Sequence, residues 1–153
     1  MNEYINFQAL PKATFNKIAS KIKPFYRNND EWTGTAHWAI LSTLEPKFLT
    51  KQAEYNIDPN NKPEIDKVIK EATEKAKTQL FIKNSFEIAG TTFCVKLSNK
   101  KYKEIVNCYF IQLFANNPAI ESDKISYWQE KQETAIIVKY GNDVIGVMMP
   151  IKK

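Results

Sequence analysis

The chain has 153 residues, of which 43% are hydrophobic, 25% charged and 12% aromatic. These proportions predict one folded domain over residues 1–153 with a single core of ordinary size. No stretch approaches the ~18 apolar residues of a membrane helix. We therefore expect a cytoplasmic protein with no signal peptide and no membrane partner.

Lysine carries almost all of the basic charge. The formal net charge is +5, and Arg27 is the only arginine among 22 basic residues. The strongest local excess lies in residues 67–103, which hold nine basic and three acidic residues. Arginine is the better side chain for reading bases, whereas lysine supplies non-specific attraction to phosphate. The candidate nucleic-acid-binding residues are Lys96, Lys100, Lys101 and Lys103, with Lys17 and Lys21 as a second group. The alternative is a solvated helix surface, partly paired with its own acidic residues.

The first third of the chain predicts one helix and one strand. Thr14 is a suitable N-cap, and apolar residues at helical spacing predict a short helix that ends before Pro24. Residues 26–33 are predicted to be a loop, and residues 35–44 a strand. Residues 46–63 contain three prolines and are not assigned.

The middle of the chain predicts two helices around a strand pair. Pro63 suits the first turn of a helix over 64–80, whose apolar stripe contains Ile65, Ile69 and Ala76. Residues 80–89 and 91–98 are predicted strands joined at Gly90. Ser98 is then a good N-cap for a third helix, which stops at residues 116–118. The predicted stripe of that helix is Tyr102, Ile105, Val106, Tyr109, Phe110 and Leu113.

The last residues predict a strand meander. Residues 124–129, 133–140 and 143–151 are short and rich in β-formers, and Gly141-Asn142 is a tight-hairpin signal. The sequence thus predicts an α+β fold: one domain with three helices and a largely antiparallel sheet that ends in a three-stranded meander.

Motifs for catalysis or metal binding are not evident in the sequence. His37 is the only histidine, no glycine-rich loop is present, and Cys94 and Cys108 lack metal-ligand spacing. We expect both cysteines to be reduced core residues. We predict no enzyme activity, no cofactor and no metal. The enzyme alternative requires a pocket that contains His37 or grouped acidic residues.

Trp32 is the aromatic residue that looks least like a core residue, because it lies between Glu31 and Thr33 in a polar stretch. Tryptophan is common in the energetically important part of protein interfaces. We therefore interpret Trp32 as a candidate partner-binding residue, together with Tyr26 and Arg27.

The C-terminal residues Val147, Met148, Met149, Pro150 and Ile151 resemble the end of the bacterial DNA polymerase sliding clamp. The predicted order of elements over 91–153 also resembles the last βαβββ unit of that family. The resemblance implies a clamp-like fold with lysines on helices facing nucleic acid. In size and in its Lys/Asn bias the chain is also similar in type to small phage or mobile-element inhibitors of host defence, including anti-CRISPR proteins.

The sequence therefore predicts a non-enzymatic binding protein that acts on a nucleic acid or a nucleoprotein through a lysine-rich face. The alternative is an inhibitor or adaptor that binds a host protein, such as an enzyme surface, without nucleic acid.

Overall fold

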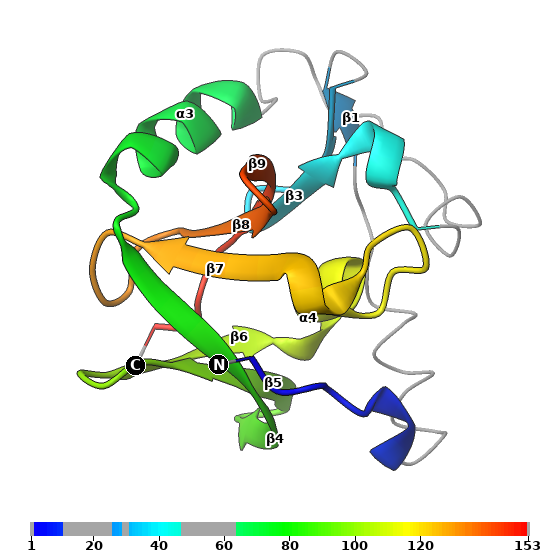
Figure 1. The fold of residues 1–153 in the computed structure, drawn as a ribbon, viewed down its shortest axis with the longest axis vertical. Helices are drawn as coiled ribbons and strands as arrows, with labels where there is room; N and C mark the ends of the chain where they lie inside the picture. Colours follow the sequence, from blue (N-terminus) through cyan, green and yellow to red (C-terminus); the bar gives the residue numbers. More distant parts are fainter. Residues whose placement is uncertain (1, 11–25, 29–30, 47–63, 153) are drawn as a thin grey trace.

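The computed structural model describes residues 2–10, 26–28, 31–46 and 64–152 (Figure 1). The predicted first helix, with Lys17 and Lys21, lies outside these residues. The α-helices within them are α3 (Ile65–Lys75) and α4 (Cys108–Ala115). Short 3-10 helices are η1 (Phe7–Ala9), η2 (Ser42–Leu44) and η4 (Ser122–Lys124). The strands are β1 (Tyr26–Asn28), β2 (Trp32–Gly34), β3 (Trp38–Leu41), β4 (Thr78–Ala89), β5 (Thr92–Ser98), β6 (Lys103–Asn107), β7 (Ile125–Gln129), β8 (Ile136–Tyr140) and β9 (Asp143–Met148).

All described strands belong to one antiparallel sheet in the order β1-β2-β3-β9-β8-β7-β4-β5-β6. The α+β class and the terminal meander β7-β8-β9 are confirmed. Gly90 and Gly141 each have a φ near +60° in the turns that join β4 to β5 and β8 to β9, as the two hairpin signals predict.

The strand β4 divides the sheet into two parts. Its first residues, Thr78–Leu80, pair with β7, and its later residues pair with β5. Between Ile82 and Phe86 the register shifts, so that residues 83–85 of β4 face only Lys96 of β5. A bulge of this kind bends a strand and increases its twist. The part formed by β4, β5 and β6 therefore turns away from the meander, as Figure 1 shows.

The main core fills the space between these two parts, where α4 lies between β7 and β6 (Figure 1). A second apolar cluster lies on the other side of the meander, beneath α3. Alternate residues of β8 serve the two clusters, because Ile136 and Val138 belong to the first and Ile137 belongs to the second. Both faces of the sheet are thus covered at β8, which explains why this strand is almost continuously apolar.

Several predicted boundaries are wrong. The strand predicted over 35–44 is limited to Trp38–Leu41, and Ser42–Leu44 form the 3-10 helix η2. Within the segment predicted to be a loop, residues 26–28 form β1, which pairs antiparallel with β2 at residues 32–34. The helix predicted over 64–80 ends at Lys75, because residues 78–80 pair with β7. The third helix begins at Cys108, since residues 103–107 form β6 beside β5. Asn107, whose side chain accepts a hydrogen bond from the Tyr109 N–H, is the real N-cap of this helix.

Among the described residues no helix is both long enough and apolar enough to cross a membrane.

The packing of α4 on the meander gives a stability test at Gly146. A Cβ atom there would lie 2.4 Å from the Ala39 carbonyl oxygen and 2.5 Å from the Phe114 ring. We expect Gly146→Ala to lower the free energy of unfolding by about 1–3 kcal/mol, because overpacking forces the neighbouring groups apart. Urea unfolding measures this change. Gly90→Asn is the control, because the added atoms meet open space and asparagine tolerates positive φ. An unchanged urea midpoint for Gly146→Ala would contradict this packing.

Candidate functional site

The turn between β5 and β6 is built around Asn99. Its side-chain oxygen accepts hydrogen bonds from the backbone N–H groups of Lys101 (2.8 Å) and Tyr102 (2.9 Å). The Asn99 N–H donates to the Tyr102 carbonyl at 3.0 Å. An asparagine that bonds to the backbone in this way stabilises a turn. Lys100 and Lys101 are therefore exposed at the end of a fixed hairpin rather than on a helix.

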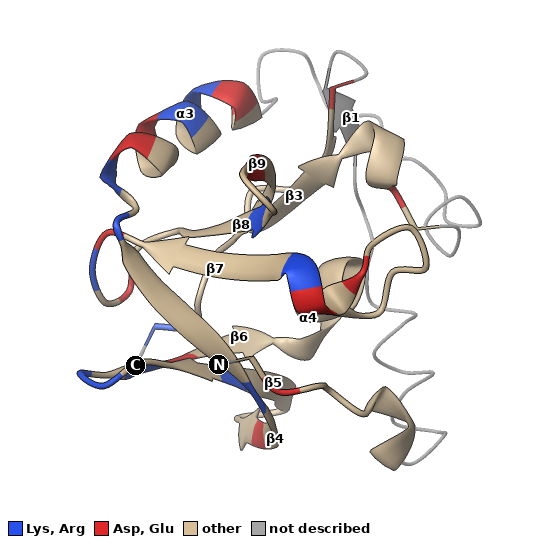
Figure 2. Cartoon of the chain, viewed as in Figure 1, with Lys and Arg blue, Asp and Glu red and all other residues tan. Residues whose placement is uncertain are grey.

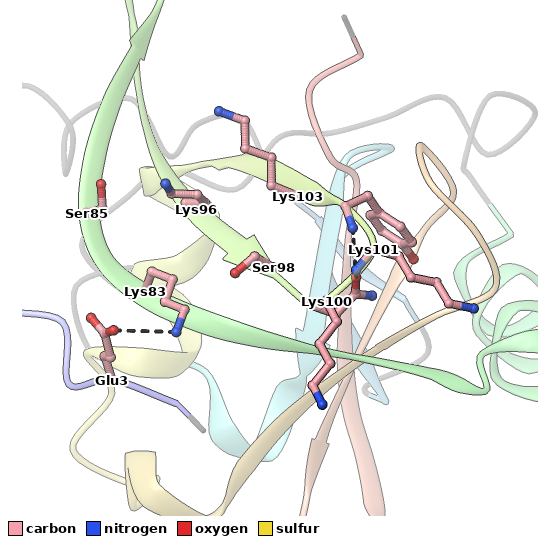
Figure 3. A pocket seen from close by; sticks show the side chains of 10 residues that line it. Glu3, Lys83, Ser85, Lys96, Ser98, Lys100, Lys101 and Lys103 are labelled. Carbon is pink, nitrogen blue, oxygen red and sulfur yellow. Dashed lines mark hydrogen bonds and ion pairs between the residues drawn. The ribbon is translucent and has the colours of Figure 1, made fainter.

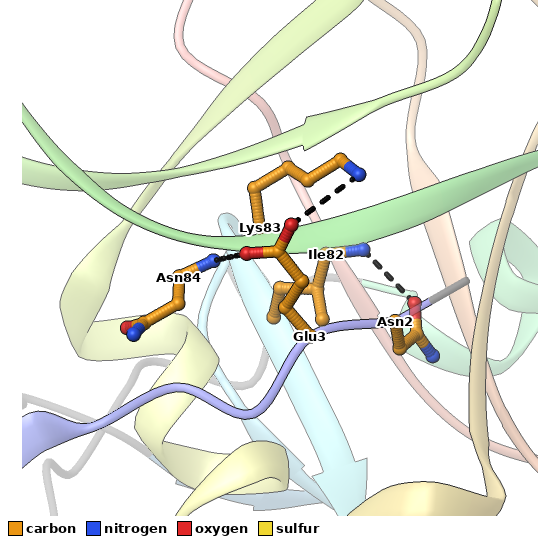
Figure 4. Close-up of polar contacts among 5 residues, drawn as sticks. All are labelled: Asn2, Glu3, Ile82, Lys83 and Asn84. Atoms are coloured by element: carbon orange, nitrogen blue, oxygen red, sulfur yellow. Dashed lines mark hydrogen bonds and ion pairs between the residues drawn. The ribbon is translucent and has the colours of Figure 1, made fainter.

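The N-terminal segment stabilises the break in β4 (Figure 4). The Asn2 side-chain oxygen accepts a hydrogen bond from the Ile82 N–H at 2.9 Å, and the Glu3 N–H donates to the Ile82 carbonyl at 3.0 Å. The Glu3 carboxylate accepts the Asn84 N–H at 3.0 Å. These bonds satisfy backbone groups of β4 around the bulge. Ile5 and Phe7, buried in the main core, anchor the segment.

The bulge and the hairpin together surround an open depression on the face of β4, β5 and β6 that points away from the core (Figure 3). We call it the lysine depression, and its volume is about 600 Å³. Its lining is polar and contains five lysines. The lining residues are Glu3, Lys83, Ser85, Lys96, Ser98, Asn99, Lys100, Lys101, Tyr102 and Lys103.

The lysine depression has more positive than negative groups. Glu87 lies between Lys96 (3.7 Å) and Lys103 (3.8 Å) and pairs with both. Glu3 pairs with Lys83 at 3.5 Å. Neither Lys100 nor Lys101 has an ion pair with any residue that the structure describes. In Figure 2 the basic residues, drawn in blue, gather near the β5–β6 turn, whereas basic and acidic residues alternate along α3.

A buried polar network lies behind the lysine depression. Gln129, which is fully buried, donates to the Glu104 carboxylate (2.6 Å) and to the Thr134 carbonyl (2.8 Å), and accepts a hydrogen bond from the Tyr102 hydroxyl (2.9 Å). The Glu104 carboxylate also accepts the N–H of Glu133 at 2.8 Å. Glu133 has a φ of 70°, an uncommon value for a residue other than glycine. The network connects the start of β6 to the loop between β7 and β8.

The structure brings some of the predicted site residues together and places others elsewhere. Lys96 lies on β5, Lys103 lies on β6, and Lys100 and Lys101 lie in the turn between them, so these four are brought together. The expected helical location of Lys100, Lys101 and Lys103 is wrong, because residues 103–107 form a strand and the other two lie in the turn before it. Lys96 lies on a strand, as predicted. Tyr26 and Arg27 lie on β1, of which only the backbone is described.

The expectation that Trp32 lies in a polar loop is wrong. It lies on β2 with 5% of its surface exposed, within the apolar cluster beneath α3. Its indole N–H is buried and has no hydrogen-bond partner in the part of the chain that the structure describes. The polar neighbours Glu31 and Thr33 concealed this burial because the covering helix lies some 30 residues further along the chain.

His37 is exposed and is one of the residues that line a small apolar hollow. The other lining residues are Thr35, Ala36, Trp38, Ala39, Ile65, Val68, Val147 and Met149. None of these neighbours is titratable. No three His, Cys, Asp or Glu side chains within the described ranges are grouped to hold a metal ion.

Cys94 and Cys108 are free thiols, and both are buried as predicted. Burial raises the pKa of the Cys94 thiol, and it raises the pKa of Cys108 to about 12. Both side chains are therefore neutral thiols at physiological pH.

Lys83 and Tyr102 are among the lining residues of the lysine depression that the sequence did not point to. Lys83 lies seven residues before Gly90 and Lys96 six residues after it, so the hairpin predicted there brings them opposite one another. Tyr102 was assigned to the buried stripe of a helix. The signal that it belongs to the turn was Asn99, a residue type that favours turns.

Comparison with known proteins finds no matching family model, no matching curated protein and no matching solved structure. The resemblance of residues 91–153 to the last unit of the sliding clamp therefore stays a prediction. In that segment the observed order is two strands, a helix and three strands, since β6 replaces the first half of the predicted helix.

Glu3 provides a test of the bonding at the β4 break. The Asn84 N–H and the Lys83 charge hold the pKa of the Glu3 carboxyl below its ordinary value. A lowered folded pKa contributes stability above the unfolded pKa, and the contribution is lost as the pH falls through the folded pKa. We expect the parent protein to be more stable than Glu3→Gln at neutral pH, and the difference to shrink in acid. Urea unfolding at several pH values measures it, and a difference independent of pH would contradict the assigned contacts.

Proposed function

We propose that this protein is a non-enzymatic binding protein that attaches to the phosphate backbone of a nucleic acid, free or within a nucleoprotein, through the lysine depression. The observation that carries this proposal is the gathering of five lysines around one open depression, where Glu3 is the one acidic residue in the lining and Glu87 pairs with two of the lysines. A concave surface lined with one sign of charge raises the local concentration of the opposite charge.

The internal ion pairs leave this surface open to an anion. The Lys96 side chain is 30% exposed and the Lys103 side chain 47% exposed, and their distances to Glu87 are 3.7 and 3.8 Å. Exposed pairs of this type contribute only about 0–1 kcal/mol. A phosphate is therefore able to replace Glu87 as the partner of both lysines at little cost.

Lysine chemistry favours backbone contact over base recognition. Its ammonium group is a compact point charge, which suits phosphate but lacks the planar fork that reads guanine. The expected binding is therefore independent of base sequence and strongly dependent on salt. Such a protein acts by occupation, as expected for the phage or mobile-element inhibitors that it resembles in type.

The alternative of a protein-directed inhibitor depended on Trp32 as an exposed anchor. The burial of Trp32 removes that support.

The test is the salt dependence of nucleic-acid binding. We expect Lys100→Gln/Lys101→Gln to weaken the binding of a mixed-sequence oligonucleotide. Each lost phosphate contact should reduce the steepness of log K against log salt by about 0.7 for a single strand or 0.9 for a duplex. Fluorescence anisotropy over a series of salt concentrations measures both quantities.

The matched control is Lys75→Gln/Lys77→Gln, which removes the same charge from exposed positions at the end of α3. This control should retain most of the parent affinity and the parent slope. Equal losses in the two variants would show that net charge alone attracts the oligonucleotide, and absent or salt-independent binding by the parent would refute the proposal.

A further inference from the structure

Tyr102 is the one aromatic residue in the lining of the lysine depression. It follows Lys101 and precedes Lys103, so cationic side chains flank it along the chain. Its side chain is half-buried, with part of the ring against the main core. The remaining surface of the residue contributes to the depression, where a ligand held by the lysines would meet it.

Tyr102 is held in place at its hydroxyl and at its backbone. Its hydroxyl donates to the buried Gln129 at 2.9 Å, and its backbone N–H donates to Asn99 at 2.9 Å. Gln129 is held in turn by Glu104 and by the Thr134 carbonyl. A side chain already fixed in this way loses little conformational entropy when a ligand binds.

The hydrogen bond to Gln129 also determines what Tyr102 offers a ligand. The hydroxyl is engaged inside the protein, and burial raises the pKa of the phenol, so the group stays protonated and neutral. What Tyr102 offers the depression that it lines is then an apolar contact rather than a hydrogen-bond donor. Bases of all types stack on such a surface, because every base has a π-face.

We infer that the ligand of the lysine depression is a single-stranded nucleic acid, one base of which stacks on Tyr102 while the lysines bind its phosphates. The inference rests on the proposed function. A duplex keeps its base faces stacked on one another, so only an unpaired strand can supply a base to the ring. The combination of a basic groove and an aromatic side chain is typical of single-strand binding without sequence preference.

The direct experiment uses the unchanged protein and three probes of the same length. These are a mixed-sequence single-stranded oligonucleotide, its duplex, and an abasic single strand with the same number of phosphates. Stacking contributes about 1–3 kcal/mol per base, which corresponds to an affinity about 5- to 150-fold higher for the ordinary strand than for the abasic strand. Equal affinities for the two strands would overturn the inference and leave the proposed function standing. No binding of any probe would overturn both.

Two variants assign the effect to Tyr102. We expect Tyr102→Leu to reduce the affinity for the ordinary strand about 5- to 150-fold and to leave the affinity for the abasic strand unchanged. Tyr102→Phe keeps the ring, and we expect it to retain the preference for the ordinary strand. Urea unfolding checks that both variants are folded, and the abasic comparison on the parent protein stands independently of them. A folded Tyr102→Leu protein that keeps the preference would refute the role of Tyr102.

Discussion

The bend in β4 is the constraint on which the arrangement of this protein depends. One strand belongs to both parts of the sheet, because its start pairs with β7 and its remainder pairs with β5. Backbone groups at the bend would be left without partners if the strand simply continued. The Asn2 and Glu3 side chains accept the N–H groups of Ile82 and Asn84 there. Two side chains thus take the place of a neighbouring strand.

The bend has two consequences for the surface. It turns β4, β5 and β6 away from the meander and so opens the space that α4 and the main core fill. It also places residues 83–85 opposite Lys96, and Lys83 and Ser85 of this stretch line the lysine depression. The hairpin turn at Asn99 adds Lys100 and Lys101. The fold therefore gathers like charges, which costs free energy unless an anion binds between them.

Carboxylates partly compensate for this repulsion. Glu87 bridges Lys96 and Lys103, and Glu3 pairs with Lys83 while it also bonds to the β4 backbone. Glu3 and Glu87 differ in how firmly the rest of the structure holds them. Glu3 belongs to a segment that Ile5 and Phe7 anchor in the core, whereas Glu87 makes only partly exposed ion pairs. A bound phosphate would therefore displace Glu87 more readily than Glu3.

The sequence predicted the features that local patterns determine. Glycine turns and short runs of β-forming residues identified β4, β5 and the meander, because these signals lie within a few residues of the structures they specify. The segment after Ser98 was misassigned because Ile105 and Val106 fit a helical stripe as well as a strand, and only pairing with β5 distinguishes the two. Trp32 and Glu3 depend on partners far along the chain, α3 for the first and Asn84 for the second. The basic excess of residues 67–103 indicated the right region, but the bulge that interrupts β4 after Ile82 has no local signature.

The location of the binding surface is the central claim, and NMR on the isotope-labelled protein tests it most directly. Titration with a single-stranded oligonucleotide should shift the backbone amide signals of Lys83, Ser85, Lys96 and residues 98–103 and leave those of α3 unchanged. Shifts concentrated on α3, or spread evenly over the molecule, would contradict the assignment of the lysine depression as the binding site.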